Sequence, residues 1–378
     1  MKIAYVTHYG KLYGANRSLL CLMDGLKDHS VQPYVIAPKQ GPITEELSKR
    51  DIPFYTAPFK RWMSVDRWKV PARLGMNLGV LPLLVRKAHE WEVDLVHTNS
   101  SVTPIGALVA EVLSLPHTWH VREFGKRDFG LQYDWGKRLF QKVMSRADAT
   151  IAVSEAVKRH VLSDVDVPSH VVYNGVIAQN RLEKLGKVAK AGDDHFSGQY
   201  TFAIVGQISP AKGQEQALRA MSRLIQEERP SRIRLLVAGS GTEKRVEFLR
   251  QLRKSLALEK NVTFLGYVSD PFEVYQQADA VLMCSPNEAM GRVTAEAMAA
   301  ARPVIGYDND GTAELIDDEH NGLLYDGTTE HLAHCMGRFV SKPGWAKSLG
   351  RNGWGKAKKE FTNEVYARRV YDVISNVL

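Results

Sequence analysis

The feature that most constrains this chain is the alternation of short, fully apolar runs with longer segments of helical periodicity. The runs include "KIAYVTH", "PYVIAP" and "DLVHTN" in the first half, and "YTFAIVG", "IRLLVAG" and "AVLMCSP" in the second half. Strands that are apolar along their whole length are typical of parallel sheets covered by helices on both faces. Because 378 residues are too many for one ordinary core, the pattern predicts an α/β protein with two Rossmann-like, doubly wound domains.

The boundary between the two domains is visible in the composition. Residues 177–199, "IAQNRLEKLGKVAKAGDDHFSGQ", have no apolar run and are rich in polar residues, and a new strand begins at Tyr200. We therefore predict a first domain over 1–176, a linker over 177–199 and a second domain over 200–357. The last segment, 358–378, has one apolar face at helical spacing, and we expect it to pack back on the first domain.

Composition and charge narrow the classes of function. The chain carries a net charge of +8, and up to residue 175 it has 23 Lys and Arg against 17 Asp and Glu. A basic first half favours anionic partners, but no basic recognition motif indicates nucleic acid. Three scattered cysteines and an N-terminal stretch unlike a secretory signal are typical of a reducing compartment. We expect a cytoplasmic protein.

Glycine and positive charge follow several of the predicted strands. "THYGKLYGANRS", "VGQISPAKG", "AGSG" and "SPNEAMGRVTAEAM" each come directly after an apolar run. In open parallel sheets, ligands bind beyond the carboxyl ends of the strands, where helix N-termini direct their amides at anions. A single glycine there is more often a turn than a ligand loop, and no Walker-type motif occurs. His117 and His120 fall on one strand with their side chains on opposite faces, so we do not expect them to bind one metal ion.

The segment "NEAMGRVTAEAMAA" at 287–300 combines two carboxylates with a predicted helix start. Amides near Gly291 would face an anion such as phosphate, and Glu288 and Glu296 would accept hydrogen bonds from sugar hydroxyls. A phosphate flanked by two sugars is a nucleotide sugar. The alternative interpretation is that Glu288 caps the helix and Glu296 lies on a solvated face, and the residues alone leave both open.

The same residues resemble a known family. "NEAMGRVTAEAMAAARPVIGYDNDGTAELI" is similar to the C-terminal signature of glycosyltransferase family 4, in which two glutamates separated by seven residues precede a helix. "VGQISPAKG", "LLVAGSG", "VTFLGYVSD" and "VVYNGV" match the family in order and spacing. The resemblance implies the GT-B fold, with two Rossmann-like domains facing a central cleft. It also implies that the first domain binds the acceptor and the second the nucleotide sugar, of UDP or GDP type.

The resemblance further implies roles for matching positions. His120, Lys212 and Glu288 would be catalytic. The donor-binding residues would be Gly14, Gly206, Gln207, Lys212, Gly239, Tyr267, Glu288, Met290, Gly291, Arg292, Val293 and Glu296. The family usually has Arg where this chain has Gln207, so that contact with the diphosphate is either missing or supplied by Arg17, Arg122 or Arg292.

A retaining, metal-independent transfer is what the resemblance implies for the reaction. Lys212 and helix amides would stabilise the leaving diphosphate, and no Asp-x-Asp metal motif follows a strand. We expect no cofactor and no metal ion. The alternatives are a relative that acts as a phosphorylase or epimerase, and a non-catalytic protein that binds sugar nucleotides. Phosphate-dependent turnover without nucleotide would identify the phosphorylase.

Residues 58–87 suggest where the acceptor lies. "PFKRWMSVDRWKVPARLGMNLGVLPLLVRK" holds seven Lys and Arg, one acid and several large apolar residues. Such a mixture suits a membrane surface rich in anionic lipid, so we expect a glycan or lipid-linked acceptor at the inner face of the cell membrane. The candidate residues are Lys60, Arg61, Trp62, Arg67, Trp68, Lys69 and Arg122. The alternative interpretation is that the apolar side chains pack on the first sheet.

Overall fold

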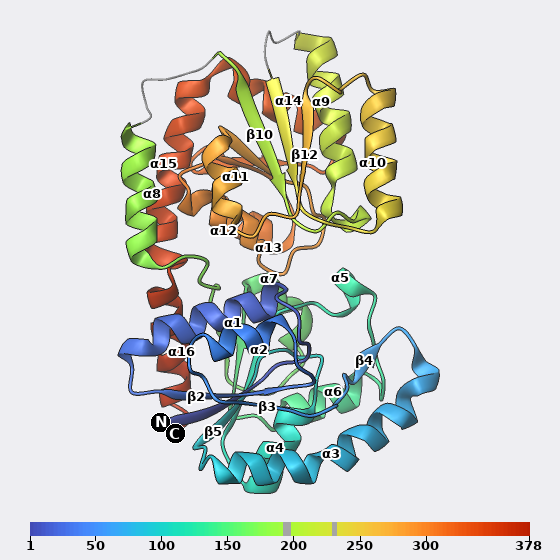
Figure 1. The fold of residues 1–378 in the computed structure, drawn as a ribbon, viewed down its shortest axis with the longest axis vertical. Coiled ribbons are helices and arrows are strands. Elements are labelled where there is room, and N and C mark those ends of the chain that lie inside the picture. Colours follow the sequence, from blue (N-terminus) through green and yellow to red (C-terminus); the bar gives the residue numbers. More distant parts are fainter. Residues whose placement is uncertain (192–197, 229–232) are drawn as a thin grey trace. The chain divides into compact units, whose positions relative to one another are not determined.

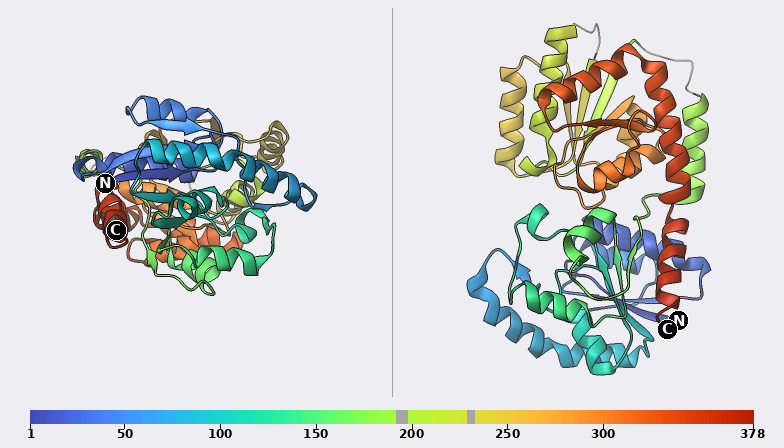
Figure 2. Two further views of the ribbon diagram at one scale, coloured as in Figure 1. Left: turned by 90° about the horizontal axis from the view of Figure 1, so that it is seen from below. Right: turned by 180° about the vertical axis from the view of Figure 1, so that it is seen from behind.

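The computed structural model describes residues 1–191, 198–228 and 233–378. It divides into two compact units (Figures 1 and 2). Unit 1 consists of Met1–Gly175 together with Asn363–Leu378, and unit 2 of Val176–Thr362. Each unit contains a parallel sheet with helices on both faces, so the predicted α/β class with two Rossmann-like domains is confirmed.

Unit 1 contains a seven-stranded sheet in the order β3-β2-β1-β5-β6-β8-β9, with parallel pairing throughout. The strands are β1 (Lys2–Val6), β2 (Gln32–Ala37), β3 (Phe54–Thr56), β5 (Leu95–Thr98), β6 (His117–Val121), β8 (Ala149–Ala152) and β9 (Ser169–Val171). Two short strands, β4 (Met63–Ser64) and β7 (Gln132–Tyr133), form a separate antiparallel pair. The strand order reverses between β1 and β5, and this is where ligands bind in open α/β sheets.

The helices of unit 1 lie on both faces of its sheet (Figures 1 and 2). They are α1 (Gly14–Gly25), α2 (Pro42–Ser48), α3 (Val70–Glu90), α4 (Ile105–Leu113), α5 (Lys126–Phe129), α6 (Lys137–Met144), α7 (Glu155–Val157) and α16 (Asn363–Ser375). Successive strand residues face opposite sides, so Ile3 and Tyr5 pack with α1, α2 and α16, while Ala4 and Val6 pack with α3 and α4.

Unit 2 is built around a six-stranded parallel sheet in the order β12-β11-β10-β13-β14-β15. The strands are β10 (Tyr200–Val205), β11 (Ile233–Ala238), β12 (Val262–Gly266), β13 (Ala280–Met283), β14 (Val304–Tyr307) and β15 (Gly322–Tyr325). The helices are α8 (Gln179–Ala191), α9 (Gln214–Glu228), α10 (Glu243–Ser255), α11 (Pro271–Gln277), α12 (Arg292–Ala299), α13 (Asp310–Leu315), α14 (Thr329–Ser341) and α15 (Pro343–Glu360). Here the strand order reverses between β10 and β13.

The segment predicted as a linker, 177–199, has a different structure over most of its described part. It contains helix α8, which packs on α12 and α15 of unit 2. Leu182 and Leu185 are buried, and the Trp354 indole N–H donates to the carbonyl of Leu182 over 3.3 Å. The polar composition concealed an amphipathic helix whose apolar residues lie three apart. Residues 192–197 of the predicted linker lie outside the described residues.

The C-terminal helix also begins later than predicted. Residues 358–360 still belong to α15 of unit 2, and the chain passes to unit 1 at Asn363. From there α16 packs beside α1, and Val370 and Ile374 join the core of unit 1. The last helix therefore completes the hydrophobic core of the unit that the first strand begins.

Replacing Ile374 tests this contribution to the core. The side chain is 1% exposed and packs in the cluster that contains Ile3 and Leu19. Ile374→Ala should lower the free energy of unfolding by about 2–5 kcal/mol, because it removes buried methyl groups and leaves a cavity. Urea unfolding is the measurement, with Asp372→Ala on the exposed side of the same helix as the control. Equal midpoints for the two variants would contradict the prediction.

Candidate active site

The carboxyl edge of the sheet in unit 2 gathers most of the residues that the sequence singled out. Gly206, Gln207 and Lys212 follow β10, and Glu288 follows β13, its neighbour across the reversal of strand order. This position is where ligands bind in open α/β sheets. The candidate site therefore lies where two adjacent strands end, and the loops after these strands carry opposite charges.

The loops after β10 and β11 lie in direct backbone contact. The N–H of Gly206 donates to Ala238 and that of Ile208 to Ser240. A Cβ on Gly239 would lie 1.8 Å from the carbonyl oxygen of Gly206, so only glycine fits there. Gly239 thus has a structural role in this arrangement, whatever it contacts in a ligand. Gln207 is exposed, and its carbonyl accepts from the Gln214 amide over 3.0 Å.

Lys212 and Glu288 form an ion pair at this edge. The ammonium group of Lys212 donates to Oε1 of Glu288, whose side chain is 15% exposed against 37% for that of Lys212. Glu288 therefore does not cap helix α12, whose N-cap is Gly291 without a side-chain cap. The interpretation of Glu288 as a helix cap is wrong.

Glu296 is held by two neighbours and is 8% exposed. The hydroxyl of Tyr275 donates to its Oε2 over 2.9 Å, and Arg292 approaches its Oε1 at 3.2 Å. Burial, and then the adjacent Glu296, raise the pKa of Tyr275 well above its ordinary value, so the phenol remains a donor. The alternative that Glu296 lies on a solvated helix face is also wrong.

The N-terminus of α12 offers several hydrogen-bond donors. Gly291 has left-handed backbone angles, φ 76° and ψ 58°, and Met290 before it is buried while Val293 is half-buried. The buried hydroxyls of Thr294 and Thr312 have no partner among the described residues. They would lie 3.4 and 3.1 Å from a Cβ on Gly291. A helix dipole and two hydroxyls without a partner among the described residues together suit an anion with several oxygens.

Two donor candidates lie elsewhere in their units. Tyr267 follows the edge strand β12 and is 66% exposed. Gly14 is the first residue of α1 in unit 1, where Tyr13 is the N-cap.

In unit 1, His120 near the end of β6 and Arg122 directly after it form a buried polar cluster. The Arg122 guanidinium approaches His120 Nδ1 at 3.2 Å and donates to Asn99 Oδ1, Asn174 Oδ1 and the hydroxyl of Tyr366. His120 Nε2 is buried and has no partner among the described residues. Burial, and then the charge of Arg122, hold the pKa of His120 well below its ordinary value. The imidazole is therefore neutral and keeps one nitrogen available.

The sequence analysis did not single out three further polar residues that lie at these strand ends or hold a site residue. His8 is mostly buried after β1, and burial lowers its pKa to about 3. Glu123, next to Arg122, is buried and hydrogen-bonded by Ser100 and Ser101. Tyr275 holds Glu296. His8 and Glu123 directly follow strands, so the rule applied to glycines and lysines would have found them, whereas nothing in the sequence marks Tyr275.

The acceptor and membrane candidates divide between the surface and the interior. Lys60, Arg61 and Lys69 are exposed, and Trp68 is 78% exposed. Trp62 is buried, stacks on Trp119 and donates its N–H to Ser101. Arg122 is buried as well, so these two are not surface residues. Arg67 lies in a 3₁₀ turn, η2 (Arg67–Lys69), and its side chain is outside the described residues.

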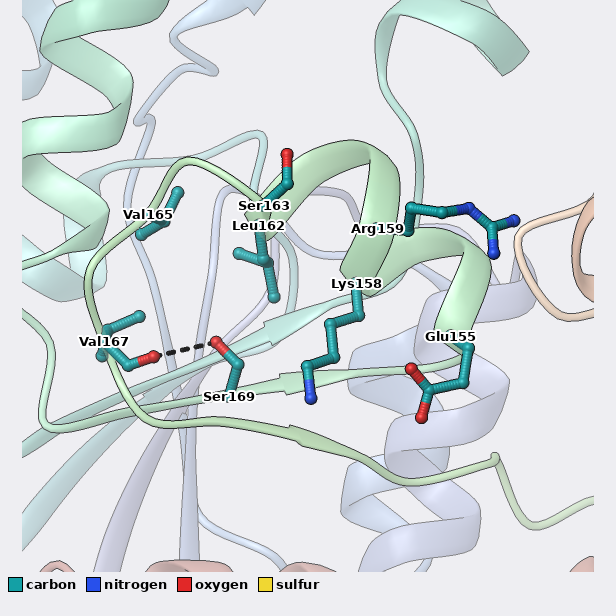
Figure 3. Close-up of a pocket in the computed structure, with 8 residues that line it drawn as sticks. All are labelled: Glu155, Lys158, Arg159, Leu162, Ser163, Val165, Val167 and Ser169. Atoms are coloured by element: carbon teal, nitrogen blue, oxygen red, sulfur yellow. Dashed lines mark hydrogen bonds between the residues drawn. The ribbon is translucent and has the colours of Figure 1, made fainter.

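A pocket of about 480 Å³ opens beside β9 in unit 1 (Figure 3). It is lined by Glu155, Lys158, Ser169 and neighbouring residues, and the Ser169 hydroxyl donates to the Val167 carbonyl. None of the predicted site residues lines it. Within 1–191, 198–228 and 233–378, no group of three or more His, Cys, Asp or Glu is placed to hold a metal ion.

Comparison with known families accounts for both units. The family described as Glycosyl transferases group 1 matches residues 189–356, and the family described as Glycosyltransferase Family 4 matches residues 13–180. The chain belongs to the glycosyltransferases of family 4 type. Its fold is GT-B and its activity is glycosyl transfer.

Individual relatives agree with this assignment. An uncharacterised glycosyltransferase of Methanocaldococcus jannaschii is 28% identical over 336 residues, which are 84% of this chain and 79% of that one. A D-inositol 3-phosphate glycosyltransferase of Rhodococcus jostii is 30% identical over 68% of this chain and 56% of its own.

Solved structures share the fold. HepE of Anabaena, determined with UDP, aligns over 100% of each chain with a TM-score of 0.83 and 22% identity. A glycosyltransferase of Rickettsia africae aligns with a TM-score of 0.81 and 20% identity, over 100% of this chain and 98% of that one.

Proposed function

We propose that this glycosyltransferase moves a sugar from a nucleotide diphosphate sugar, of UDP or GDP type, to a glycan or lipid-linked acceptor, with retention of anomeric configuration and without a metal ion. The reaction would belong to bacterial polysaccharide, lipopolysaccharide or glycolipid synthesis, in the cytoplasm. The observation that carries the proposal is the convergence of Lys212, Glu288, Glu296 and the N-terminus of α12 at one edge of the sheet in unit 2.

The chemistry of this edge matches the parts of such a donor. The amides and hydroxyls around Gly291 suit a diphosphate, and HepE of Anabaena has been solved with UDP-glucose. Glu296, anchored by Tyr275 and Arg292, can accept hydrogen bonds from ribose hydroxyls. Oε2 of Glu288 accepts no hydrogen bond from the described residues, whereas Oε1 binds Lys212, and Glu288 would orient the transferred sugar.

Charge stabilisation of the leaving diphosphate would supply much of the catalysis. Positive groups fixed before the reaction stabilise the transition state without reorganising during it. Lys212 would carry this role, since it is paired with Glu288 in the loop that precedes α12. Since Glu288 is occupied by Lys212, the acid and nucleophile pair of a glycosidase fits this site poorly, and the departing phosphate would help to deprotonate the acceptor.

A screen of donor hydrolysis tests the proposal. Wild-type protein is incubated with UDP-glucose, UDP-galactose, UDP-N-acetylglucosamine and GDP-mannose, and released nucleotide is measured by mass spectrometry. We expect slow release from at least one donor, and Lys212→Ala should reduce it about 10²-fold or more because it removes transition-state charge. Release from none of the four, or turnover only with inorganic phosphate and no nucleotide, would refute the proposal.

Two controls separate the role of Lys212 from indirect effects. Lys244→Ala removes an exposed lysine of α10 and should leave the rate within threefold of wild type. Lys212→Ala also leaves Glu288 without its partner, so it is combined with Glu288→Gln. Recovery of the wild-type rate in the double variant would show that Lys212 serves only to neutralise Glu288.

Glu296 gives a separate test of nucleotide binding. Because it would accept hydrogen bonds from ribose, Glu296→Ala should weaken binding of UDP or GDP by about 1–3 kcal/mol, the range for hydrogen bonds to a charged group. Isothermal calorimetry is the measurement. Glu273→Ala, an exposed acid on the neighbouring helix α11, is the matched control, and identical affinities for the two variants would remove Glu296 from the ribose site.

We further propose that unit 1 takes its acceptor at an anionic membrane surface. Along η2 and the first turns of α3, Val65, Trp68, Leu74, Met76 and Leu78 are exposed. Lys60, Arg61 and Lys69 are exposed beside them in the sequence. Exposed apolar side chains next to basic ones suit the headgroup region of a bilayer. Among the described residues, no helix is long and apolar enough to cross a membrane, so the contact would be peripheral.

The structure also reduces the set of residues available for that contact. Arg73, counted among the basic residues of the segment, is bound by Asp134 at 2.7 Å, with side chains 13% and 1% exposed. Asn77, Val80 and Leu84 are the inward side of α3. The alternative that this segment packs on the sheet therefore holds for its inner residues and fails for the exposed ones.

Liposome flotation tests the membrane proposal. Wild-type protein should float with vesicles of phosphatidylcholine and phosphatidylglycerol and less with phosphatidylcholine alone. Lys60, Arg61 and Lys69 changed together to Ser should reduce flotation severalfold, since each basic residue near an anionic surface contributes about 1 kcal/mol. The triple variant Lys244, Arg250 and Lys254 to Ser, on α10 of unit 2, is the charge-matched control. If wild type does not float, the acceptor is soluble.

A further inference from the structure

Glu123 is a buried carboxyl group that the proposed reaction does not yet use. It stands two residues beyond β6, at the carboxyl edge of the sheet in unit 1, and is 7% exposed. The loop after the adjacent strand β5 faces it with Ser100 and Ser101. It therefore lies near the reversal of strand order between β1 and β5, where this unit is expected to bind a ligand.

The two oxygens of Glu123 have different surroundings. Oε1 accepts three hydrogen bonds of 2.8 Å, from the hydroxyls of Ser100 and Ser101 and from the N–H of Ser101. Oε2 accepts none from the described residues, and it is not among the fully buried atoms that lack a partner. One oxygen therefore anchors the side chain, and the other is open to a hydrogen-bond donor from outside the protein.

No cation of the described chain neutralises Glu123. The adjacent Arg122 is directed to Asn99, Asn174, His120 and Tyr366. A buried carboxylate that serves only stability is normally paired or fully hydrogen-bonded, because an unpaired buried charge is costly. Oε2 accepts no hydrogen bond from the described residues that would offset the cost of burying this charge.

The charged and titratable groups around Glu123 define what it would bind. Asp128 of α5 and Tyr9 from the loop after β1 interact with it electrostatically, and Arg122 and Arg61 act on the neighbouring His8. Burial raises the pKa of Glu123 to about 7, and Asp128 adds to this, while the three hydrogen bonds oppose it. The nearby arginines disfavour an ammonium ligand, whereas a neutral hydroxyl is an acceptable donor.

We propose that Glu123 binds the acceptor, its Oε2 accepting a hydrogen bond from a hydroxyl group of a neutral carbohydrate. This inference rests on the proposed function, because it assigns the acceptor end of the same reaction. It adds a substrate class, a sugar or polyol with a free hydroxyl, and a residue that recognises it. His8, Tyr9 and Asp128 line the same edge and shape its electrostatics.

Glu123→Gln isolates the role of Oε2. The amide oxygen can keep the three hydrogen bonds that Oε1 accepts, while an NH₂ group, which donates only, replaces Oε2. A structural role therefore predicts little change, and acceptor binding predicts a loss. The protein is assayed with UDP-glucose, UDP-galactose, UDP-N-acetylglucosamine and GDP-mannose as donors and the octyl glycosides of glucose, galactose, mannose and N-acetylglucosamine as acceptors, with products detected by mass.

The expected result separates the acceptor from the donor. Glu123→Gln should lower transfer to the octyl glycosides at least tenfold, mainly through a higher KM for the acceptor, and leave calorimetric affinity for UDP or GDP within twofold. The inference would be overturned if the variant transferred sugar as well as wild type, or if its affinity for nucleotide fell as much as its transfer. It would also be overturned if wild type bound nucleotide but used none of the glycosides. A wild type that binds neither UDP nor GDP would reject the proposed function itself.

The pH dependence gives a readout that a structural role would not move. Since the carboxylate form is required, wild-type kcat/KM for the acceptor should rise as the pH increases through about 7. Asp128→Asn removes the negative charge that raises the pKa of Glu123, so the rise should move to lower pH. Glu123→Gln should abolish it. An unchanged profile in both variants would show that another group titrates.

Discussion

The hydrogen bond from the N–H of Gly311 to the carbonyl of Glu288, 3.0 Å long, is the contact on which the candidate site at the carboxyl edge of the sheet in unit 2 depends. It joins the loop after β14 to the loop after β13, and a Cβ on Gly311 would lie 2.4 Å from the carbonyl oxygen of Ala289. These contacts hold the backbone around Glu288. The side chain of Glu288 pairs with Lys212, and helix α12 begins after the left-handed turn at Gly291. Two carboxylates and a helix terminus are thus placed by backbone packing.

The buried charges at the sheet edges of the two units have different partners. In unit 2 the charges are paired, Lys212 with Glu288 and Arg292 with Glu296, so neither carboxylate is left alone at low dielectric. In unit 1 the adjacent Arg122 and Glu123 are hydrogen-bonded by neutral groups and do not bind one another. Unpaired buried charges lower stability, and such costs are concentrated at functional sites.

Much of the fold could be predicted because its strands are buried on both faces. A run such as "YTFAIVG" has few other stable arrangements, and the rule on carboxyl ends then placed Lys212, Glu288 and Glu296 on one edge. The prediction of a linker over 177–199 missed helix α8 for a physical reason. Composition reports average polarity, whereas α8 needs only Leu182, Leu185 and a small Gly186 against Trp354 to form an amphipathic helix.

Side-chain pairing was the part of the site that sequence could not supply. That Lys212 would bind Glu288, or Tyr275 would bind Glu296, depends on contacts across 76 and 21 residues that no local pattern encodes. Trp62 shows the same limit, because tryptophan beside Lys and Arg reads as a membrane contact, yet its indole stacks on Trp119 and donates inward. Trp68, six residues later, remains exposed with the Lys69 ammonium 4.7 Å from its ring. The inward-facing stretch is therefore short: residues 62–64 are buried, whereas Lys60 and Arg61 before them and Trp68 after them are exposed.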